Sequence, residues 1–248
     1  YDLLGASQEQ SIKPKKFSQV NIDEAIIAHT NDPEFQKLKS DQYMEAFRDR
    51  TNKVDVPYTL KWSEELKILE KDYGPGKVKH HIAPHTLEIA ALWSVLTRLD
   101  DDKEGKISLT EKAELYDGKL LPGWTEDSVK EMKDKYPDEG MTSGMSIRYL
   151  QDKISNCLSN HHDYVNMFMV LNELKDGLEN SSLLSNKEHI NKYMTCVDLC
   201  VKKLTEILSN EVQKALVGAE DAMVRLCANY IDNLMAYNGK AKIKDPIT

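Results

Sequence analysis

The chain has 248 residues, 40% hydrophobic and 30% charged, with a formal net charge of −8 at pH 7, so it can form one large domain or two ordinary ones. The acidic balance argues against nucleic acid or an anionic membrane as the main partner, because phosphate-binding surfaces normally show a basic excess. No apolar run approaches the roughly 20 residues that a membrane-spanning helix needs.

Two apolar runs near the N-terminus predict strands. Residues 22–29, IDEAIIAH, hold little polar relief after Glu24, as in a strand buried on both faces. Residues 54–56 alternate and are closed by Pro57, which lacks the donor that a central strand needs next. Two such strands cannot form a stable sheet alone. We therefore expect their partner strands upstream of Tyr1 or on another copy of the chain.

The pattern becomes helical from about residue 63. Ser63, followed by two glutamates, is typical of a helix cap, and the turn around Gly74 ends that helix. Pro84 then precedes HTLEIAALWSVLTRL, whose broad apolar face predicts a largely buried helix. Further helices are expected after Thr125, over 147–158, over 164–178, over 187–218 and from there to 237.

Thr30 and Asn31 follow the first predicted strand. At the carboxyl edge of an open α/β sheet, where such folds bind ligands, their side chains could orient a water molecule against a γ-phosphate. The alternative is a Thr-Asn-Asp-Pro turn that merely caps the strand, and turn chemistry taken alone favours it.

Three arginines are further candidates. Arg48 and Arg50 lie at the end of the predicted helix EAFRDR, where they could stabilise phosphoryl-transfer charge on a nucleotide held by a neighbouring subunit. Favourable interaction of cations with a helix C-terminus is the ordinary alternative. Arg148 begins the helix of GMSIRYLQDKIS, where a cation opposes the helix dipole, although a surface arginine needs no function.

Residues 100–111, DDDKEGKISLTE, fit the EF-hand frame of oxygen ligands, a central glycine and a final glutamate. Against calcium binding, Glu104 at position five would crowd the cation, and no second loop pairs with this one. A solvated acidic turn is the alternative.

Other motifs are weak or absent. His80, His81 and His85 are interrupted by Pro84, and the chain has no His-Glu-x-x-His pattern, so we expect no metal site there. It also has neither a G-x-x-x-x-G-K-[ST] phosphate loop nor the glycine-rich, His-Arg-Asp and Asp-Phe-Gly signals of eukaryotic-type kinases. The four cysteines lie in helical patterns without disulfide-type spacing, which favours a reducing cytoplasm; they are Cys157, Cys196, Cys200 and Cys227.

An ordered series of segments is more specific than any one of them. The series is IIAHTNDPEF, EAFRDR with VDVPY, HIAPHTLEIAALWSVLTRL, AELYDGK, MSIRYLQDKIS, LNELKDGL, EVQKALVGAEDA and NYIDNLMAYNGKAKIKDPIT. Over nearly the whole chain it resembles the bacterial PrkA serine protein kinase family.

The resemblance implies an AAA+ ATPase-type protein. Its fold would be mainly α: a helical bundle made of an AAA+ lid and C-terminal helices, with a small α/β remnant of a nucleotide-binding sheet at the N-terminus. Residues 1–60 would be the later part of the AAA+ core, 61–160 the helical lid and 161–248 the PrkA C-terminal region.

The resemblance also implies roles for matching residues. Thr30 and Asn31 would form the first nucleotide sensor, Arg148 the second sensor, and Arg50 the arginine finger, with Arg48 the weaker candidate. ATP and Mg²⁺ would be the cofactors, and the phosphate loop and acidic metal-binding strand are expected upstream of Tyr1.

The implied reaction is transfer of the ATP γ-phosphate to protein serine or threonine, and the fragment alone would be inactive. An AAA+ ATPase that drives protein remodelling or proteolysis is an alternative, because a fold does not fix its use. A non-catalytic helical interaction module that responds to calcium is another. We expect a protein substrate, a homo-oligomeric ring and a cytoplasmic location, with neither nucleic acid nor membrane as a partner.

Overall fold

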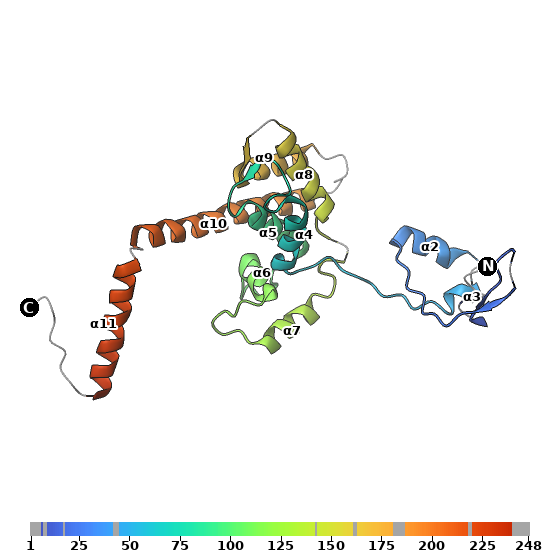
Figure 1. Ribbon diagram of the computed structural model, residues 1–248, viewed down its shortest axis with the longest axis horizontal. Helices are drawn as coiled ribbons and strands as arrows, with labels where there is room; N and C mark the ends of the chain where they lie inside the picture. The colour runs from blue at the N-terminus through green and yellow to red at the C-terminus, as the bar shows by residue number, and fades with distance from the viewer. Residues whose placement is uncertain are drawn as a thin grey trace, which may run out of the picture. The chain divides into compact units, whose positions relative to one another are not determined.

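The structure is a computed structural model, and it describes residues 6, 9–16, 18–41, 45–141, 143–160, 163–180, 187–217 and 220–239. The chain divides into two compact units, Tyr1–Val56 and Pro57–Thr248 (Figure 1). Helices dominate the described residues, with only two-stranded sheets beside them, so the predicted mainly α fold is confirmed. Within the described part of the chain no helix is long and apolar enough to cross a membrane.

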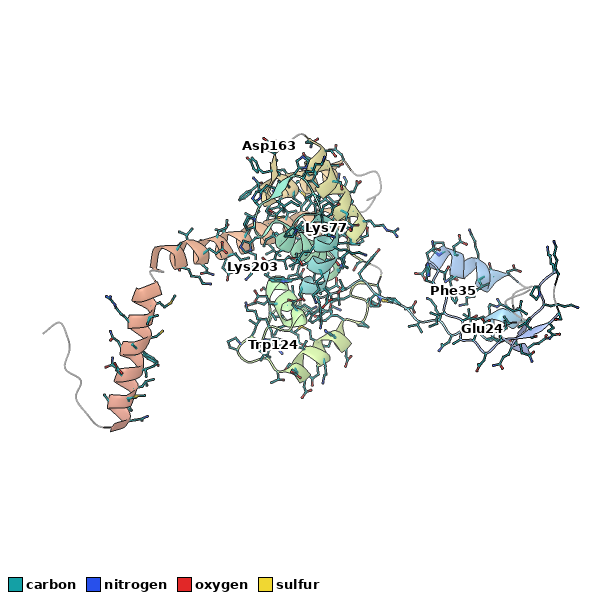
Figure 2. All side chains as sticks on the ribbon, viewed as in Figure 1. Glu24, Phe35, Lys77, Trp124, Asp163 and Lys203 are labelled. Atoms are coloured by element: carbon teal, nitrogen blue, oxygen red, sulfur yellow. The ribbon has the colours of Figure 1, made fainter. Side chains whose placement is uncertain are left out.

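The first unit is small and open. It contains an antiparallel pair, β1 (Ser11–Ile12) with β2 (Val20–Asn21), and two helices, α2 (Asp32–Ser40) and α3 (Glu45–Arg48). No residue of α2 is buried, although the ring of Phe35, labelled in Figure 2, lies 5.2 Å from the Lys53 ammonium nitrogen. Within the described part of this unit Ala6 is the one buried hydrophobic residue, so surface contacts such as this one predominate there.

The strands expected at 22–29 and 54–56 are not formed. Both segments lack strand pairing, and Ile27, Val54 and Val56 are 95%, 75% and 85% exposed. A central strand needs neighbours on both sides to satisfy its backbone groups and cover its side chains, whereas the described sheet of this unit is a single two-residue ladder. The two strands predicted over 22–29 and 54–56 are therefore wrong for this chain by itself.

The second unit is a helical assembly around α5 (Thr86–Arg98). The other helices are α4 (Trp62–Tyr73), α6 (Leu109–Asp117), α7 (Glu126–Lys135), α8 (Ile147–Ser159), α9 (Met167–Glu179), α10 (Lys187–Val217) and α11 (Glu220–Gly239). A short parallel pair joins β3 (His81–Ile82) to β4 (Tyr164–Val165). Helix α5 contacts α4, α6, α8, α9 and α10, so it is the centre of this unit.

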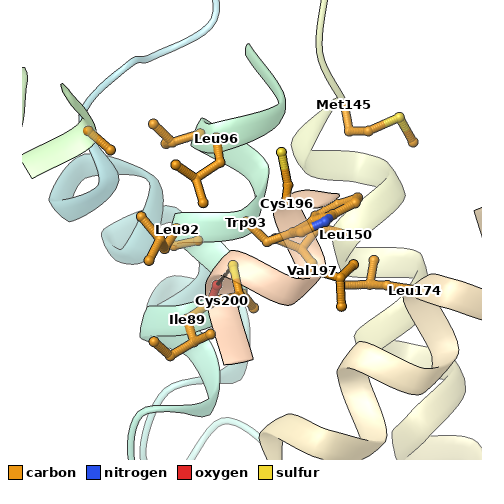
Figure 3. Packing of buried hydrophobic residues seen from close by; sticks show 14 of the residues in the cluster. Ile89, Leu92, Trp93, Leu96, Met145, Leu150, Leu174, Cys196, Val197 and Cys200 are labelled. Carbon is orange, nitrogen blue, oxygen red and sulfur yellow. Dashed lines mark hydrogen bonds between the residues drawn. The ribbon is translucent and has the colours of Figure 1, made fainter. Parts of the chain in front are cut away.

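The burial of α5 follows from its sequence. Every residue from Ile89 to Arg98 is buried, as expected for a helix with apolar side chains on nearly all faces. Trp93 lies among residues of α8, α9 and α10 (Figure 3), and its indole nitrogen donates to the Tyr193 carbonyl oxygen at 3.2 Å. Cys196 and Cys200 are buried free thiols in the same core, as expected from their helical spacing.

Two helix starts differ from the sequence predictions. Helix α4 begins at Trp62, and the Ser63 amide donates at 2.9 Å to the carboxylate of Asp117, so a residue of α6 accepts the hydrogen bond that a cap would take. The predicted helix over 164–178 begins only at Met167, after β4 and the capping residue Asn166. Thr125 caps α7 as predicted.

At its C-terminal end, α5 carries a buried ion pair. Arg98 and Glu65 have side chains that are 0% and 2% exposed, and their charged atoms lie 2.5 Å apart. The Ser94 hydroxyl donates to the same carboxylate at 2.8 Å. The pair joins α4 to α5 within the apolar core, where removal of one charge leaves the other without compensation.

We expect Glu65→Ala to lower the free energy of unfolding by about 3–5 kcal/mol, because it strands the Arg98 charge in the core. Exchange of both charges for apolar residues, Arg98→Met with Glu65→Leu, should cost less than Glu65→Ala: it leaves no buried charge, although the Thr59 and Met145 carbonyl oxygens lose a donor. Urea denaturation of the purified chain measures both. Glu64→Ala, which breaks only an exposed pair with Lys67, is the control and should change little; an equal loss for Glu64→Ala would contradict the prediction.

Candidate functional site

Asn31 is a helix cap in the structure. Its side-chain oxygen accepts a hydrogen bond from the Glu34 amide at 3.0 Å, at the start of α2, while Thr30 and Asn31 are both exposed. This is the turn role that local chemistry favours. The cap uses only Oδ1, so the Nδ2 group of Asn31 can still donate to a ligand. The sensor role and the cap are therefore compatible.

The two candidate finger residues differ in their surroundings. Helix α3 ends at Arg48, whose guanidinium donates to the Lys39 carbonyl oxygen in the last turn of α2. Arg50 lies in the turn beyond α3 and is exposed, so the prediction that both arginines belong to the helix end is wrong for Arg50. Asp49 and Arg50 form a turn directly after α3. Arg48 therefore helps to join two helices of its own unit, whereas Arg50 is presented at the surface.

A surface network brings the segment after Arg50 close to the start of α2. The Lys53 ammonium group lies 2.6 Å from the Asp55 carboxylate and 3.4 Å from that of Asp32. The hydrogen bond to Asp55 is the main cause of the raised pKa of Lys53. Because Asp32 follows Asn31 directly, this network places two of the predicted site segments side by side within the first unit.

Arg148 is the second residue of α8 in the second unit, and it is exposed. The Ser146 hydroxyl caps this helix by accepting from the Tyr149 amide at 3.3 Å, and the first turn contains no acidic residue. The positive end of the helix dipole and the guanidinium therefore favour an anion at the same place. Arg148 and the candidates of the first unit belong to different units, so their meeting at one nucleotide stays a prediction.

The turn that leads into α8 is held by residues that the sequence analysis missed. Arg98 donates to the Met145 carbonyl oxygen from Nε at 3.2 Å and from Nη2 at 3.0 Å. The Met145 amide donates to the Thr97 hydroxyl at 2.9 Å, and the Gly144 amide to the Tyr193 hydroxyl at 3.2 Å. The sequence feature that could have identified these contacts is Arg98, a charged residue inside the apolar run ALWSVLTRL.

The loop over 100–111 is not arranged for calcium. Glu111, the twelfth residue, accepts from the Ser108 amide at 2.9 Å and hydroxyl at 2.6 Å in a capping box. The Asp102 carboxylate accepts from the Lys106 and Glu104 amides, and the first of these lowers its pKa most.

The carboxylates of Asp102 and Glu111 thus accept from amides and hydroxyls, and that of Glu104 pairs with Lys106 and Lys135. No group of three or more metal-ligand side chains gathers within the described ranges. This geometry favours the solvated acidic turn, and calcium binding stays a prediction that no observation here tests.

His85 joins the start of α5 to α10. It precedes α5 in the left-handed backbone region, with φ of 61°. Its ring nitrogens lie 2.7 Å from the Glu88 carboxylate and 2.9 Å from that of Glu211 on α10. The hydrogen bond with Glu88, followed by that with Glu211, raises the pKa of His85.

Comparison with protein families and curated proteins gives consistent matches. A family model described as the PrkA AAA domain matches residues 1–106, and one described as the PrkA serine protein kinase C-terminal domain matches residues 110–248. A relative named ATP-dependent protease PrkA, from Bacillus subtilis (strain 168), is 39% identical over 251 residues, covering 100% of this chain and 40% of the relative.

Another relative, from Escherichia coli (strain K12), is named serine/threonine kinase YeaG. It is 30% identical over 227 residues, covering 87% of this chain and 34% of the relative. The chain thus spans well under half the length of both relatives. No solved structure matches the chain.

We expect the His85 bridge to stabilise the chain more at about pH 6 than at about pH 9. The folded-state pKa of His85 lies above its ordinary value of 6.5, so its contribution is complete below 6.5 and is lost as the pH rises through the folded-state pKa. Urea unfolding of the chain and of His85→Gln at both pH values measures this. The difference between the two proteins should shrink at the higher pH; a constant difference would contradict the assignment.

Proposed function

Because the chain belongs to the PrkA family and carries its AAA-type domain, we propose that it is part of an ATP-dependent protein kinase that transfers the γ-phosphate of Mg-ATP to serine or threonine. The observation that carries this proposal is the pairing, along one chain, of an AAA domain match with a serine protein kinase C-terminal domain match. ATP use follows from the AAA-type domain, and the protein hydroxyl as acceptor is the finer step that we propose.

The chain supplies arginines and polar groups for this reaction rather than a complete nucleotide site. The 248 residues contain no phosphate-loop sequence, and across the described ranges no carboxylate cluster is placed for Mg²⁺. Binding of Mg-ATP therefore requires phosphate-loop and metal-ligating residues from outside these 248 residues.

In the proposed reaction, Asn31 and Thr30 orient the attacking oxygen against the γ-phosphate. Arg148 contacts the bound nucleotide from the helical unit. Arg50 stabilises the negative charge that spreads over the phosphoryl oxygens in the transition state, as an arginine finger does. Its exposed position supports action across a subunit interface, and hence a homo-oligomeric ring. Arg48 is the weaker candidate, because its guanidinium already donates to Lys39.

ATP-dependent proteolysis is the second candidate function. The relative with the higher identity, 39%, is named a protease, whereas the one at 30% is named a kinase. The same sensors and finger would serve either activity, because they act on ATP rather than on the protein substrate. In both cases we propose a protein substrate and a cytoplasmic location, the latter supported by the buried free thiols.

We expect Arg50→Ala, in the full-length protein, to lower the rate of ATP hydrolysis by about 10³-fold or more while nucleotide affinity changes little, because the finger acts on the transition state. Steady-state hydrolysis and nucleotide titration measure the two quantities. Arg225→Ala, at an exposed arginine of α11, is the matched control and should retain activity. An equal loss of affinity and rate would indicate misfolding rather than loss of a finger.

Incubation of the full-length protein with γ-labelled ATP separates the two activities. We expect label on protein serine or threonine if the protein is a kinase. Substrate cleavage with phosphate release, and without labelled protein, would overturn the kinase proposal. The 248-residue chain by itself should show no turnover in the same assay, because it has no phosphate loop.

A further inference from the structure

Arg98 has contacts beyond its ion pair with Glu65. Its Nη1 group donates at 2.9 Å to the Thr59 carbonyl oxygen, and its guanidinium carbon lies 4.9 Å from the centre of the Tyr58 ring. The Nε and Nη2 groups donate to the Met145 carbonyl oxygen. One guanidinium thus binds the first residues of the helical unit and the turn before α8 at the same time.

The turn before α8 has little freedom to move. Both the amide and the carbonyl group of Met145 are hydrogen-bonded to the last turn of α5, through Thr97 and Arg98. Gly144 has φ of 103°, and a Cβ atom there would lie 2.8 Å from the Arg98 Cα atom and overlap its Cγ atom. Only glycine allows this approach without strain. The backbone two residues before α8 is therefore fixed against α5.

The position of Arg148 follows from this turn. Ser146, the next residue after Met145, caps α8, and Arg148 is the second residue of that helix. The hydrogen bonds of Met145 therefore set the direction in which the first turn of α8, and with it Arg148, leaves the core. We propose that Arg98 is the positioning residue for Arg148, holding α8 in register with the segment at Tyr58 and Thr59 through which the chain enters the helical unit.

The chemistry of Arg98 supports positioning over simple stability. A buried ion pair is often no more stabilising than apolar residues of similar volume, so stability alone does not account for a fully buried arginine. The planar guanidinium, however, presents donors in fixed directions, which allows it to bind Glu65, Thr59 and Met145 together. An apolar side chain could fill the volume but could not orient the Met145 peptide group.

This inference rests on the proposed function, and a double-mutant cycle in the full-length protein tests it. The first change is Arg98→Met with Glu65→Leu, which removes the guanidinium without leaving a buried charge. We expect kcat/KM for ATP hydrolysis to fall by about 10- to 100-fold, the effect of misplacing a site by about an ångström. In the Arg148→Ala background the same change should cost less than about twofold, because there is no sensor left to position.

The matched control is Lys112→Met with Glu139→Leu. That pair is also 2.5 Å apart and buried, but its hydrogen bonds reach Asp100 and Tyr116 and, within the described residues, not the 144–146 turn. It should leave kcat/KM nearly unchanged. Equal losses with and without Arg148, or no loss from the Arg98 variant, would overturn the positioning role.

Amide hydrogen exchange over 145–149 gives a readout that does not depend on activity. Exchange should quicken in the Arg98 variant and not in the control, and unchanged exchange would also overturn the proposal. Quickened exchange together with full activity of Arg148→Ala would instead overturn the sensor assignment alone. If the Arg98 variant fails to fold, Thr97→Val removes the hydroxyl that accepts from Met145, and the same cycle applies.

Discussion

A guanidinium without access to water has to find all of its partners inside the protein, and the helical unit is arranged around that requirement at Arg98. The carboxylate comes from α4, the supporting hydroxyl from Ser94 on α5 itself, and main-chain oxygens from the segments at Thr59 and Met145. Each partner belongs to a different stretch of sequence. Apolar burial brings these helices together, and Arg98 defines how their ends meet.

A second buried ion pair lies beside the loop over 100–111. Lys112 on α6 lies 2.5 Å from Glu139, which also accepts from the Asp100 amide at 2.7 Å and from the Tyr116 hydroxyl at 3.0 Å. Burial, followed by the negative charge of Glu139, raises the pKa of Tyr116 well above its usual range, so that hydroxyl stays protonated as a donor. The acidic loop over 100–111 is therefore anchored at its start by this network, through the backbone amide and carbonyl groups of Asp100.

The sequence predicted those features that depend on residues close together in the chain. The apolar run of α5 predicts burial because nearly every face of that helix is hydrophobic, and Thr125 predicts a cap because its partner Ser128 is three residues away. The sequence did not predict hydrogen bonds whose two partners lie far apart in the chain. Ser63 has the residues of a cap around it, but the acceptor for its amide is Asp117, 54 residues later, which no local pattern reveals.

The difference between local and distant partners also matters for the predictions at the candidate site. Residues 22–29 have the composition of a central strand, yet a strand is defined by its neighbours, and the exposed Ile27 shows that this chain alone does not provide them. The turn alternative for Asn31 placed it at the end of a strand, whereas it caps α2 through a contact within residues 31–34; its sensor role stays a prediction. Arg98 was overlooked since an arginine at the end of an apolar helix also fits a favourable helix-dipole interaction.

The contact made by Arg48 bears on its use as an arginine finger. To reach a phosphate on another subunit, Arg48 would have to release the Lys39 carbonyl oxygen in the last turn of α2, and that helix end would lose a charge-assisted hydrogen bond. Arg50 is exposed in the turn beyond α3. A finger contributes most when its donors reach the transition state without breaking bonds elsewhere, because preorganised groups need no rearrangement during the reaction. That loss counts against Arg48 as the finger. Its contact instead fixes the end of α3 against α2, and α3 leads directly into the turn that contains Arg50.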